Sequence, residues 1–451
     1  MLLKNSIHRV TVEDVDGFMN GVAHVEGQAV FIKGALEGEE MDIKITKAQK
    51  THAFARIDTL HSQNPHRQPP SCKHYKTCGG CVCMHMDYAH TLEVKRRHVQ
   101  QVLKRIGGIS IDVPEVMGGE SPFSYRNKTA LPIEIKDNEP VAGFYMTNSH
   151  TLVPIDTCLI AKPPSNEAVK AVLQWMKQEK IQKNLVRHVV CRVNQQGEIM
   201  VVLVINGKSL PKQAQLLERL QAQIPKLASL AISINRKDTN VILGNNFTTL
   251  YGNERLQDTL CGFSYALSPL SFYQINRDQA ERLYQTALDF ASLTGEETVA
   301  DMYCGAGTIS LLLAQKAKHV HGVEIVKEAI ADAKMNAKNN GVTNVTFYAE
   351  DAKECLPRLV KNGQRFDTVV LDPPRKGVDT EVLDALLTVS PKKIVYVSCN
   401  VATQARDAKY LCERGYKVEK VQAVDMFCWT GHVETVMLLT KRNSAHPIET
   451  K

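Results

Sequence analysis

The sequence contains no long hydrophobic run, no internal repeat and no low-complexity block. No apolar stretch approaches the roughly 20 residues that a membrane-spanning helix requires, so we expect neither a transmembrane helix nor a membrane partner. The first residues, MLLKNSIHRV, lack the apolar core and the small-residue cleavage site of a secretory signal. The sequence therefore predicts a protein that stays in the cytoplasm.

A chain of 451 residues exceeds the size of one ordinary hydrophobic core, so we expect two or three domains. Hydrophobic residues make up 43% of the chain and charged residues 23%, which is typical of a soluble globular protein. The net charge of +7 is compatible with a polyanionic partner, although charge alone supports one only weakly. Twelve cysteines in a cytoplasmic protein are not expected to form a disulfide framework, so some are candidate ligands or nucleophiles.

The pattern of apolar residues and glycines divides the chain into three regions and a tail. Residues 1–60 show short alternating segments broken by glycines, which predicts a small antiparallel β-barrel. Residues 61–262 mix strand-like segments with an amphipathic helix, and the segment at about 90–113 is expected to pack on the region that follows. The helix has a basic face, which includes Lys95, and an opposite apolar face formed by Leu92, Val99, Val102, Leu103 and Ile106. Residues 263–443 alternate strands with helices, which predicts a doubly wound, mostly parallel sheet. The polar tail at 444–451 is expected to be frayed.

The segment TVADMYCGAGTISLLLA predicts a buried strand, a glycine-rich turn and the start of a helix. Gly305 and Gly307 would let a ligand approach the backbone closely, but the full G-x-G-x-x-G fingerprint of dinucleotide-binding proteins is absent. Glu324 and Asp351 follow the next two predicted strands, and ligands of such sheets bind at the carboxyl ends of the strands. These residues predict a cofactor site; the alternative is that both acids are merely solvated strand ends.

Two further strand ends carry reactive groups. The segment FDTVVLDPPRKGVD places Asp372 before two prolines that stiffen the turn, and KKIVYVSCN places Cys399 at the end of the following strand. Free cysteines are often small buried hydrophobic residues, so one interpretation of Cys399 is core packing. If this strand end faces the cofactor crevice, Cys399 is instead a candidate nucleophile.

The motifs SFYQIN, LDPPRKG, YVSCN and GHVETVMLL resemble those of the RNA uracil-5-methyltransferase family. The resemblance covers nearly the whole chain, and the N-terminal barrel resembles a TRAM domain. It implies an α/β fold in which a Rossmann-like class I methyltransferase domain follows an OB-like β-barrel and a central mixed α+β domain carrying an iron–sulfur cluster. It also implies that the cofactor is S-adenosyl-L-methionine.

The resemblance assigns roles to particular residues. Carbon 5 of uracil accepts a methyl group only after a thiolate has added to carbon 6, and by resemblance Cys399 supplies that thiolate. The ordinary cysteine pKa is ~8.5, so the site is expected to favour the thiolate. Glu434 is then the base that removes the carbon-5 proton, with a pKa that its apolar strand should raise, although the residues alone favour a paired structural carboxylate. The positions that match the family's cofactor and active-site residues are Gln274, Tyr303, Thr308, Glu324, Asp351 and Asp372.

One position departs from the family pattern. Cys428 stands where relatives commonly carry proline, which places a second thiol near the expected site. This departure puts no catalytic residue in doubt, but a second thiol would complicate chemical labelling of Cys399.

A second group of cysteines lies outside the catalytic region. Cys72, Cys78 and Cys81 form a C-x5-C-x2-C pattern, and Cys158 follows later in the chain. Closely spaced cysteines suit a soft metal, but zinc sites usually contain two C-x2-C pairs, and ordinary packing cysteines are a further alternative. The resemblance implies that these four residues hold a 4Fe-4S cluster with a structural or RNA-positioning role, with Cys83 as an alternative to Cys81.

The resemblance also implies that the partner is RNA, and that a target uridine must be turned out of its stack. The basic segments VKRRH, LKRIGG, YRNK and PPRKG are candidates for phosphate contacts. Chain length, the barrel and the cysteine segment together favour 23S ribosomal RNA, with one or two target uridines, over transfer RNA. We expect a monomer.

Two other classes of function compete with carbon-5 methylation. Methylation of an exocyclic nitrogen is disfavoured because it needs neither Cys399 nor Glu434. A non-catalytic RNA-binding or iron–sulfur sensor protein is disfavoured because candidate residues are present at every catalytic position.

Overall fold

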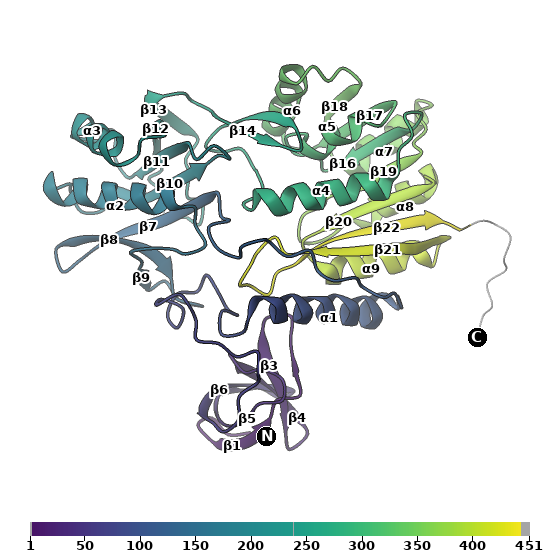
Figure 1. Ribbon diagram of the computed structural model, residues 1–451. Coiled ribbons are helices and arrows are strands. Elements are labelled where there is room, and N and C mark those ends of the chain that lie inside the picture. The colour runs from purple at the N-terminus through teal and green to yellow at the C-terminus, as the bar shows by residue number, and fades with distance from the viewer. Residues whose placement is uncertain (1, 238, 443–451) are drawn as a thin grey trace.

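The computed structural model describes residues 2–237 and 239–442, so the predicted tail at 444–451 lies outside the described residues. Three large sheets form separate layers along the chain, and the N-terminal one extends away from the other two (Figure 1). The predicted fold class is confirmed: a small curled β-sheet, a central α+β unit and a doubly wound α/β unit follow one another. Within the described residues, no helix is long and apolar enough to cross a membrane.

The N-terminal sheet has the strand order β1-β5-β6-β4-β3-β2. Its strands are β1 (Ile7–Thr11), β2 (Asp14–Val15), β3 (Asn20–Val25), β4 (Gln28–Lys33), β5 (Glu40–Ala48) and β6 (His52–Leu60). Alternate residues of β5, namely Met41, Ile43 and Ile45, are fully buried in the core of this sheet. The sheet is not wholly antiparallel as predicted, because β4 and β6 pair in parallel.

Helix α1 (Tyr88–Gly107) begins where the Asp87 side chain accepts a hydrogen bond from the His90 amide, and it ends before Gly108 in the left-handed conformation. Its residues Val99 and Leu103 are buried in the same core as helix α9 (Val401–Cys412). This helix belongs to the doubly wound α/β unit, which carries the residues predicted to be catalytic and is therefore named the catalytic unit. The segment predicted to reach the catalytic unit therefore does so through α1, which Figure 1 shows beneath α9.

Two predictions about this helix are wrong in detail. Ile106, expected on the apolar face, is 43% exposed. Lys95, expected on the basic face, is 1% exposed because it pairs with a buried carboxylate of the catalytic unit.

The central sheet has the order β13-β12-β11-β10-β7-β8-β9, with helices α2 (Pro163–Gln178) and α3 (Gln213–Gln223) covering one face. Its strands are β7 (Lys128–Lys136), β8 (Glu139–Tyr145), β9 (Leu152–Pro154), β10 (Val186–Val193), β11 (Ile199–Ile205), β12 (Leu227–Ile234) and β13 (Asn246–Gly252). Every residue of β11 is buried, because both faces of this strand are covered. A hairpin of β14 (Leu256–Leu260) and β15 (Phe263–Leu267) leads into the catalytic unit.

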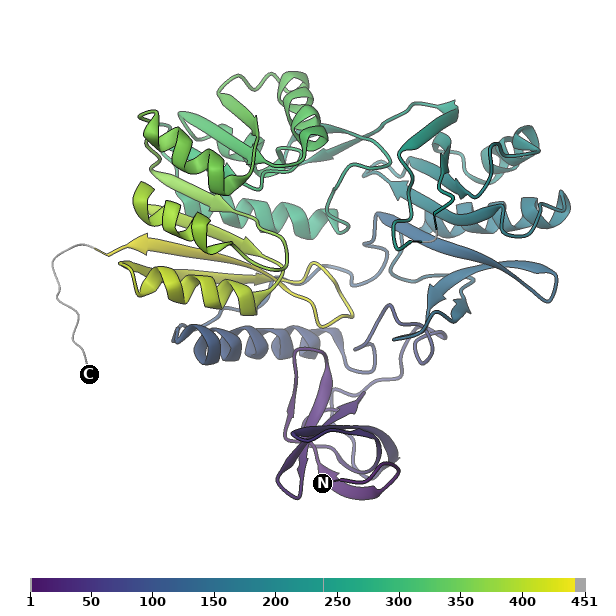
Figure 2. The ribbon, with the colours of Figure 1, turned by 180° about the vertical axis from the view of Figure 1, so that it is seen from behind.

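The catalytic sheet has the order β18-β17-β16-β19-β20-β22-β21. Its strands are β16 (Thr298–Met302), β17 (His319–Glu324), β18 (Val345–Ala349), β19 (Thr368–Leu371), β20 (Lys393–Ser398), β21 (Tyr416–Val424) and β22 (Glu434–Lys441). Helices α4 (Arg277–Ala291), α5 (Thr308–Ala314) and α6 (Lys327–Asn339) pack on one face. Helices α7 (Ala352–Lys361), α8 (Thr380–Val389) and α9 (Val401–Cys412) pack on the other (Figure 2).

The strand order of this sheet reverses between β16 and β19, since β17 and β18 extend to one side of β16 and β19 and β20 to the other. The five strands from β18 to β20 are mutually parallel, so their carboxyl ends share one edge. Ligands of open α/β sheets bind at such a reversal. Strand β22 inserts antiparallel between β20 and β21, which brings the start of β22 to the same edge.

The burial of α1 predicts that Leu103→Ala destabilises the fold although the residue lies outside the catalytic unit. Removing this fully buried side chain should lower the free energy of unfolding by about 2–5 kcal/mol. Ile106→Ala on the same helix is the matched control and should change it by less than about 0.5 kcal/mol, because Ile106 is largely exposed. Guanidinium unfolding measures both; equal losses for the two variants would contradict the packing of α1 on α9.

Candidate active site

The glycine-rich turn after β16 forms the first wall of the candidate site. Tyr303, Gly305 and Gly307 all have positive φ, and Tyr303 at φ 67° is a side-chain-bearing residue in a conformation that such residues rarely adopt. A Cβ added at Gly307 would lie 3.0 Å from Phe347, so this position has little room for a side chain. The turn exposes backbone at the sheet edge, as the sequence predicts.

Glu324 and Asp351 lie at the same edge, but their carboxylates already accept backbone hydrogen bonds. Glu324 accepts from the amides of Gly305 at 3.3 Å and Val326 at 2.9 Å, which joins the end of β17 to the glycine-rich turn. Asp351 caps helix α7 by accepting from the Lys353 amide at 3.1 Å. Both acids are partly accessible, so each retains acceptor capacity toward a ligand.

Tyr284 of helix α4 connects several of the predicted residues and was not singled out from the sequence. The residue is 4% exposed, and the side chains of Thr308 and Gln274 lie near enough to its phenol to influence its ionisation. Burial and the nearby Asp372 raise the pKa of Tyr284, so the phenol is neutral and available as a donor. A tyrosine at helical spacing on an apolar face looks like core in the sequence, and only the packing of α4 on the sheet shows its role.

Asp372, Cys399 and Glu434 converge at the carboxyl end of β19 and β20. Cys399 directly follows β20 and Glu434 begins β22, and the antiparallel register pairs Ser398 with Thr435. Continuing that register by one residue sets Cys399 across from Glu434, which raises the pKa of the thiol. Cys399 is partly exposed whereas Glu434 is 4% exposed.

The electrostatics of this group are those of crowded acids beside one cation. Burial, reinforced by Asp372, raises the pKa of Glu434 to about 8, and Arg375 opposes the shift. Burial raises the pKa of Asp372 to about 7, even though the side chain keeps partial exposure. Burial and Glu434 also raise the pKa of Cys399, again opposed by Arg375. Without a substrate, Cys399 is therefore held as a thiol, contrary to the expected preference for the thiolate.

The turn that carries Arg375 is fixed to the strand that carries Cys399. The Asn400 side chain donates to the Arg375 carbonyl at 3.0 Å and also caps helix α9 by accepting from the Ala402 amide. The Asp372-Pro373-Pro374-Arg375 turn thus cannot move independently of Cys399.

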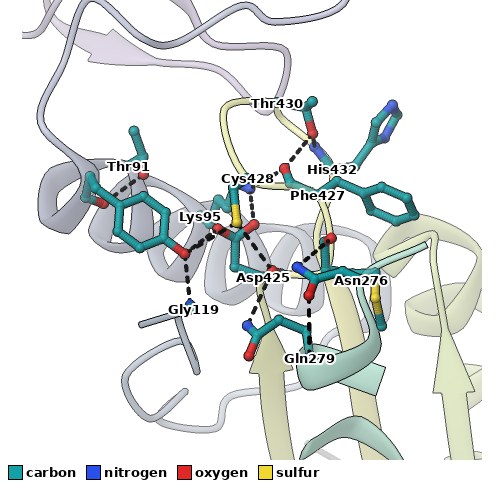
Figure 3. Close-up of polar contacts among 12 residues, drawn as sticks. Thr91, Lys95, Gly119, Asn276, Gln279, Asp425, Phe427, Cys428, Thr430 and His432 are labelled. Carbon is teal, nitrogen blue, oxygen red and sulfur yellow. Dashed lines mark hydrogen bonds and ion pairs between the residues drawn. The ribbon is translucent and has the colours of Figure 1, made fainter. Parts of the chain in front are cut away.

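The loop that precedes Glu434 is anchored by a buried ion pair (Figure 3). Lys95 of α1 lies 2.5 Å from Asp425, and the two side chains are 1% and 0% exposed. The Tyr88 hydroxyl donates to the other carboxylate oxygen of Asp425 at 2.8 Å, and Lys95 reaches the Phe427 carbonyl at 3.3 Å. Breaking this pair would leave an unpaired charge buried away from water. The pair therefore holds α1 and the loop before Glu434 in one relative position.

Cys428 belongs to this loop and is fully buried beside the Tyr88 hydroxyl. Burial raises the pKa of Cys428 to about 12. The second thiol near the site is therefore much less reactive toward labelling reagents than its position in the sequence suggests.

The four cysteines Cys72, Cys78, Cys81 and Cys158 line one small pocket of about 60 Å³. Cys83 does not line it; this thiol is fully buried near Lys95 and Cys428. Nowhere in the described ranges, 2–237 and 239–442, do three or more His, Cys, Asp or Glu side chains converge closely enough to hold a metal ion. The geometry therefore gathers the predicted ligands around a common cavity but shows no metal centre.

The cysteine segment also contacts the loop before Glu434. The Val82 amide donates to the Trp429 carbonyl at 2.8 Å, and the Tyr125 hydroxyl donates to the Cys428 carbonyl at 3.1 Å. These bonds join the cysteine segment and the central unit to the loop before Glu434.

The raised pKa of Glu434 predicts how stability depends on pH. A carboxyl whose pKa rises on folding contributes stability that is present below its unfolded pKa and is lost as pH rises through its folded pKa, here about 8. Glu434→Gln cannot ionise, so its Tm should rise relative to the wild type as pH increases from 4.5 to about 8, the interval between the unfolded and folded pKa values. The exposed Glu218→Gln is the control, and thermal unfolding by circular dichroism measures all three. Parallel pH profiles for the wild type and Glu434→Gln would contradict the buried, neutral carboxyl.

Comparison with known proteins places these features in a family. The model of the tRNA (uracil-5-)-methyltransferase family matches residues 87–442, and the model of the TRAM domain matches residues 2–57. An uncharacterized RNA methyltransferase of Listeria innocua is 43% identical over 98% of this chain and 99% of its own length. One of Halalkalibacterium halodurans is also 43% identical, over 98% of each chain.

A solved structure resembles the whole chain. The Pyrococcus abyssi tRNA (uracil-54, C5)-methyltransferase in complex with S-adenosyl-L-homocysteine superposes with a TM-score of 0.76 at 27% identity. The match covers 96% of this chain and 99% of the archaeal one. Together with the family match over most of the chain, this agreement shows that the protein is a member of the tRNA (uracil-5-)-methyltransferase family of S-adenosyl-L-methionine-dependent RNA methyltransferases.

Proposed function

We propose that this protein methylates carbon 5 of a uridine in 23S ribosomal RNA, with Cys399 as the nucleophile and Glu434 as the proton acceptor. The observation that carries the proposal is the position of Cys399 across from Glu434, at the sheet edge where the strand order reverses. A partly exposed thiol can reach a uracil ring that has been turned out of its stack. The buried carboxyl of Glu434 is available to accept a proton later in the reaction.

The charges of the site suit a reaction in which one anion is present at a time. Arg375 lowers the pKa of both Cys399 and Glu434. Glu434 and Asp372 raise the pKa of Cys399, and Asp372 also raises that of Glu434. When the Cys399 thiolate bonds to carbon 6 of uracil, its negative charge leaves the sulfur for the ring. Glu434 is then easier to ionise, so its proton passes to solvent, and the resulting carboxylate accepts the carbon-5 proton once carbon 5 carries the methyl group. Loss of that proton expels Cys399 as a thiolate and restores the ring.

S-adenosyl-L-methionine, when bound, supplies an electrophilic methyl group at this edge. The residues that would hold it are Gln274, Tyr303, Thr308, Glu324, Asp351 and Asp372. Of these, Glu324 accepts a hydrogen bond from the Gly305 amide, and Gln274 and Thr308 lie near the buried Tyr284. The glycine-rich turn leaves backbone accessible beside them.

Methylation of an exocyclic nitrogen is the less favoured chemistry for this geometry. Such a reaction requires neither a thiol at the edge of the ring nor a carboxyl that accepts a proton from carbon. The chain nevertheless places Glu434, with a pKa of about 8, across from Cys399. A carboxyl kept at that pKa is a better proton acceptor than an ordinary solvated one.

Transfer RNA is the second candidate substrate, and one observation favours it. The archaeal structure that matches nearly the whole chain is described as a tRNA (uracil-54, C5)-methyltransferase. A tRNA enzyme can therefore have this length and architecture, so chain length does not discriminate between the two substrates. That match is too extensive to leave out the barrel, so the barrel does not discriminate either, and the cysteine segment of residues 72–81 is what supports ribosomal RNA.

A mechanism trap tests both the chemistry and the substrate. Unmodified 23S ribosomal RNA and transfer RNA transcripts are made with 5-fluorouridine and incubated with the protein and S-adenosyl-L-methionine. Fluorine cannot leave carbon 5 as a proton, so we expect a covalent adduct at Cys399 that carries one added methyl, formed with the ribosomal transcript.

Cys399→Ala should abolish the adduct, and the buried Cys428→Ala should leave it intact. An adduct with transfer RNA alone would replace ribosomal RNA as the substrate. Methyl transfer to ordinary RNA without any adduct would make nitrogen methylation the better account.

We further propose that Cys72, Cys78, Cys81 and Cys158 hold a 4Fe-4S cluster. All four thiols line the same pocket, and an iron–sulfur cluster needs one thiolate on each of four separate irons rather than convergence on a single ion. The pocket also contains Tyr75, Phe144 and Ile160, so bound iron and sulfide would be shielded from water.

Iron analysis of protein purified without oxygen tests the cluster. We expect about four irons and four sulfides for each chain, with thermal stability falling when they are chelated. Cys78→Ser should lower the iron content, whereas Cys191→Ser, at a buried cysteine of β10, should not. Zinc in place of iron in the wild-type protein would overturn the proposal.

A further inference from the structure

A second hollow lies on the central sheet, on the face that α2 and α3 leave uncovered. Its volume is about 330 Å³, at the lower end of the range of about 300–1,000 Å³ that is typical of ligand pockets. The residues that line it are Lys128, Ala130, Val190, Asn240, Val241, Ile242, Leu243 and Leu270. Val190 packs with the core on this face, whereas its neighbours Val189 and Cys191 pack with the core beneath the helices.

Two cations stand directly opposite one another at this face. Lys128 of β7 and Arg192 of β10 are partners in the antiparallel ladder, next to the pair formed by Ala130 and Val190. Like charges at paired positions of two strands repel and destabilise a sheet. Burial and Arg192 lower the pKa of Lys128 to about 8, which reflects that repulsion.

Neither cation has a carboxylate partner among the described residues. No carboxylate oxygen of residues 2–237 or 239–442 lies within 4.0 Å of Lys128 or Arg192. Arg192 is 3% exposed, and while its Nη2 donates to the Ser271 carbonyl at 2.6 Å, its Nη1 has no hydrogen-bond partner there. A buried guanidinium with an unused donor calls for an acceptor from outside the described chain.

The nearest acid does not supply that acceptor. Asp258 influences the ionisation of Arg192, but its carboxylate accepts from the amides of Gln195 at 3.0 Å and Thr259 at 2.9 Å. Burial raises the pKa of Asp258, so its negative charge is itself disfavoured. The charge balance at the hollow therefore remains positive.

The hollow adjoins the segment that leads into the candidate active site. Leu270, 54% exposed, lines the hollow, and Phe272, 76% exposed, follows two residues later and precedes Gln274. The Asn127 side chain donates to the Gln274 carbonyl at 2.8 Å, which fixes this segment to the residue before Lys128. The chain therefore runs from the hollow at Leu270 to Gln274, a residue predicted to hold the cofactor, within four positions.

We propose that this hollow binds an unstacked nucleotide next to the target uridine, with its phosphate on Lys128, whose strand partner is the buried Arg192, and its base against Val190 and Leu270. The proposal rests on the proposed function only in taking RNA as the substrate. Single-stranded RNA is recognised through splayed bases and paired cations of this kind, and a phosphate between the two cations would relieve their repulsion.

Salt-dependent RNA binding tests the hollow without requiring methylation. The probe is a fluorescein-labelled oligouridylate of about twelve nucleotides, and its Kd is measured by anisotropy between about 50 and about 300 mM KCl. Lys128→Gln should reduce the slope of log K against log salt by about 0.7, the contribution of one phosphate on a single strand. That loss corresponds to about fourfold weaker binding at about 0.15 M salt.

Two variants serve as comparisons. Lys170→Gln, on the exposed surface of α2 on the opposite face of the sheet, should leave both the slope and Kd unchanged. Ala130→Leu fills the hollow without changing charge, so it should weaken binding while keeping the wild-type slope. Circular dichroism confirms that each variant is folded.

Photo-crosslinking identifies the nucleotide's position. An oligouridylate carrying 4-thiouridine should crosslink to the segment around Leu243 or Leu270, and this signal should fall in Ala130→Leu. Unchanged slopes for Lys128→Gln, or crosslinks confined to other surfaces, would overturn the proposal. RNA binding through the hollow by a protein that transfers no methyl group would refute the proposed function but not this inference.

Discussion

The antiparallel pairing of β20 with β22 is the constraint on which the candidate active site depends. Parallel strands alone would bring only strand ends to the reactive edge, whereas the reversed β22 brings its first residue there. Glu434 therefore meets Cys399 from the opposite direction, and a nucleophile and a carboxyl from distant parts of the sequence become neighbours. The register must hold to within one residue, because a slip would turn Glu434 to the other face of the sheet.

That register is supported from outside the catalytic unit. The Lys95–Asp425 pair fixes the loop before β22 to α1, and the Val82 amide fixes the same loop to the cysteine segment. Because both charges of the pair are buried, the interaction costs desolvation and is weak support for overall stability. Its structural effect is instead to define where α1 and the loop meet, so that the position of Glu434 depends on the central region as well as on the catalytic sheet.

Crowded charges occur at the sheet edge and on the central sheet. At the sheet edge, Asp372 and Glu434 carry raised pKa values of about 7 and about 8, and Arg375 opposes the shift of Glu434. On the central sheet, Lys128 and Arg192 repel one another. Burial and like charges reduce the stability of the fold at both places. Such a loss is common where a site is arranged to bind a ligand.

The sequence by itself determined the elements and their order, because strands such as Thr298–Met302 and Lys393–Ser398 are apolar runs bounded by turn residues. It also identified which strand ends carry reactive groups, since motif spacing is local. Only the tertiary structure decided that Tyr284 lies near Gln274 and Thr308, that Lys95 is buried, and that Cys83 lies away from the cysteine pocket. These outcomes depend on packing between segments far apart in the chain, and the period of a single helix or strand does not specify the partner it will meet.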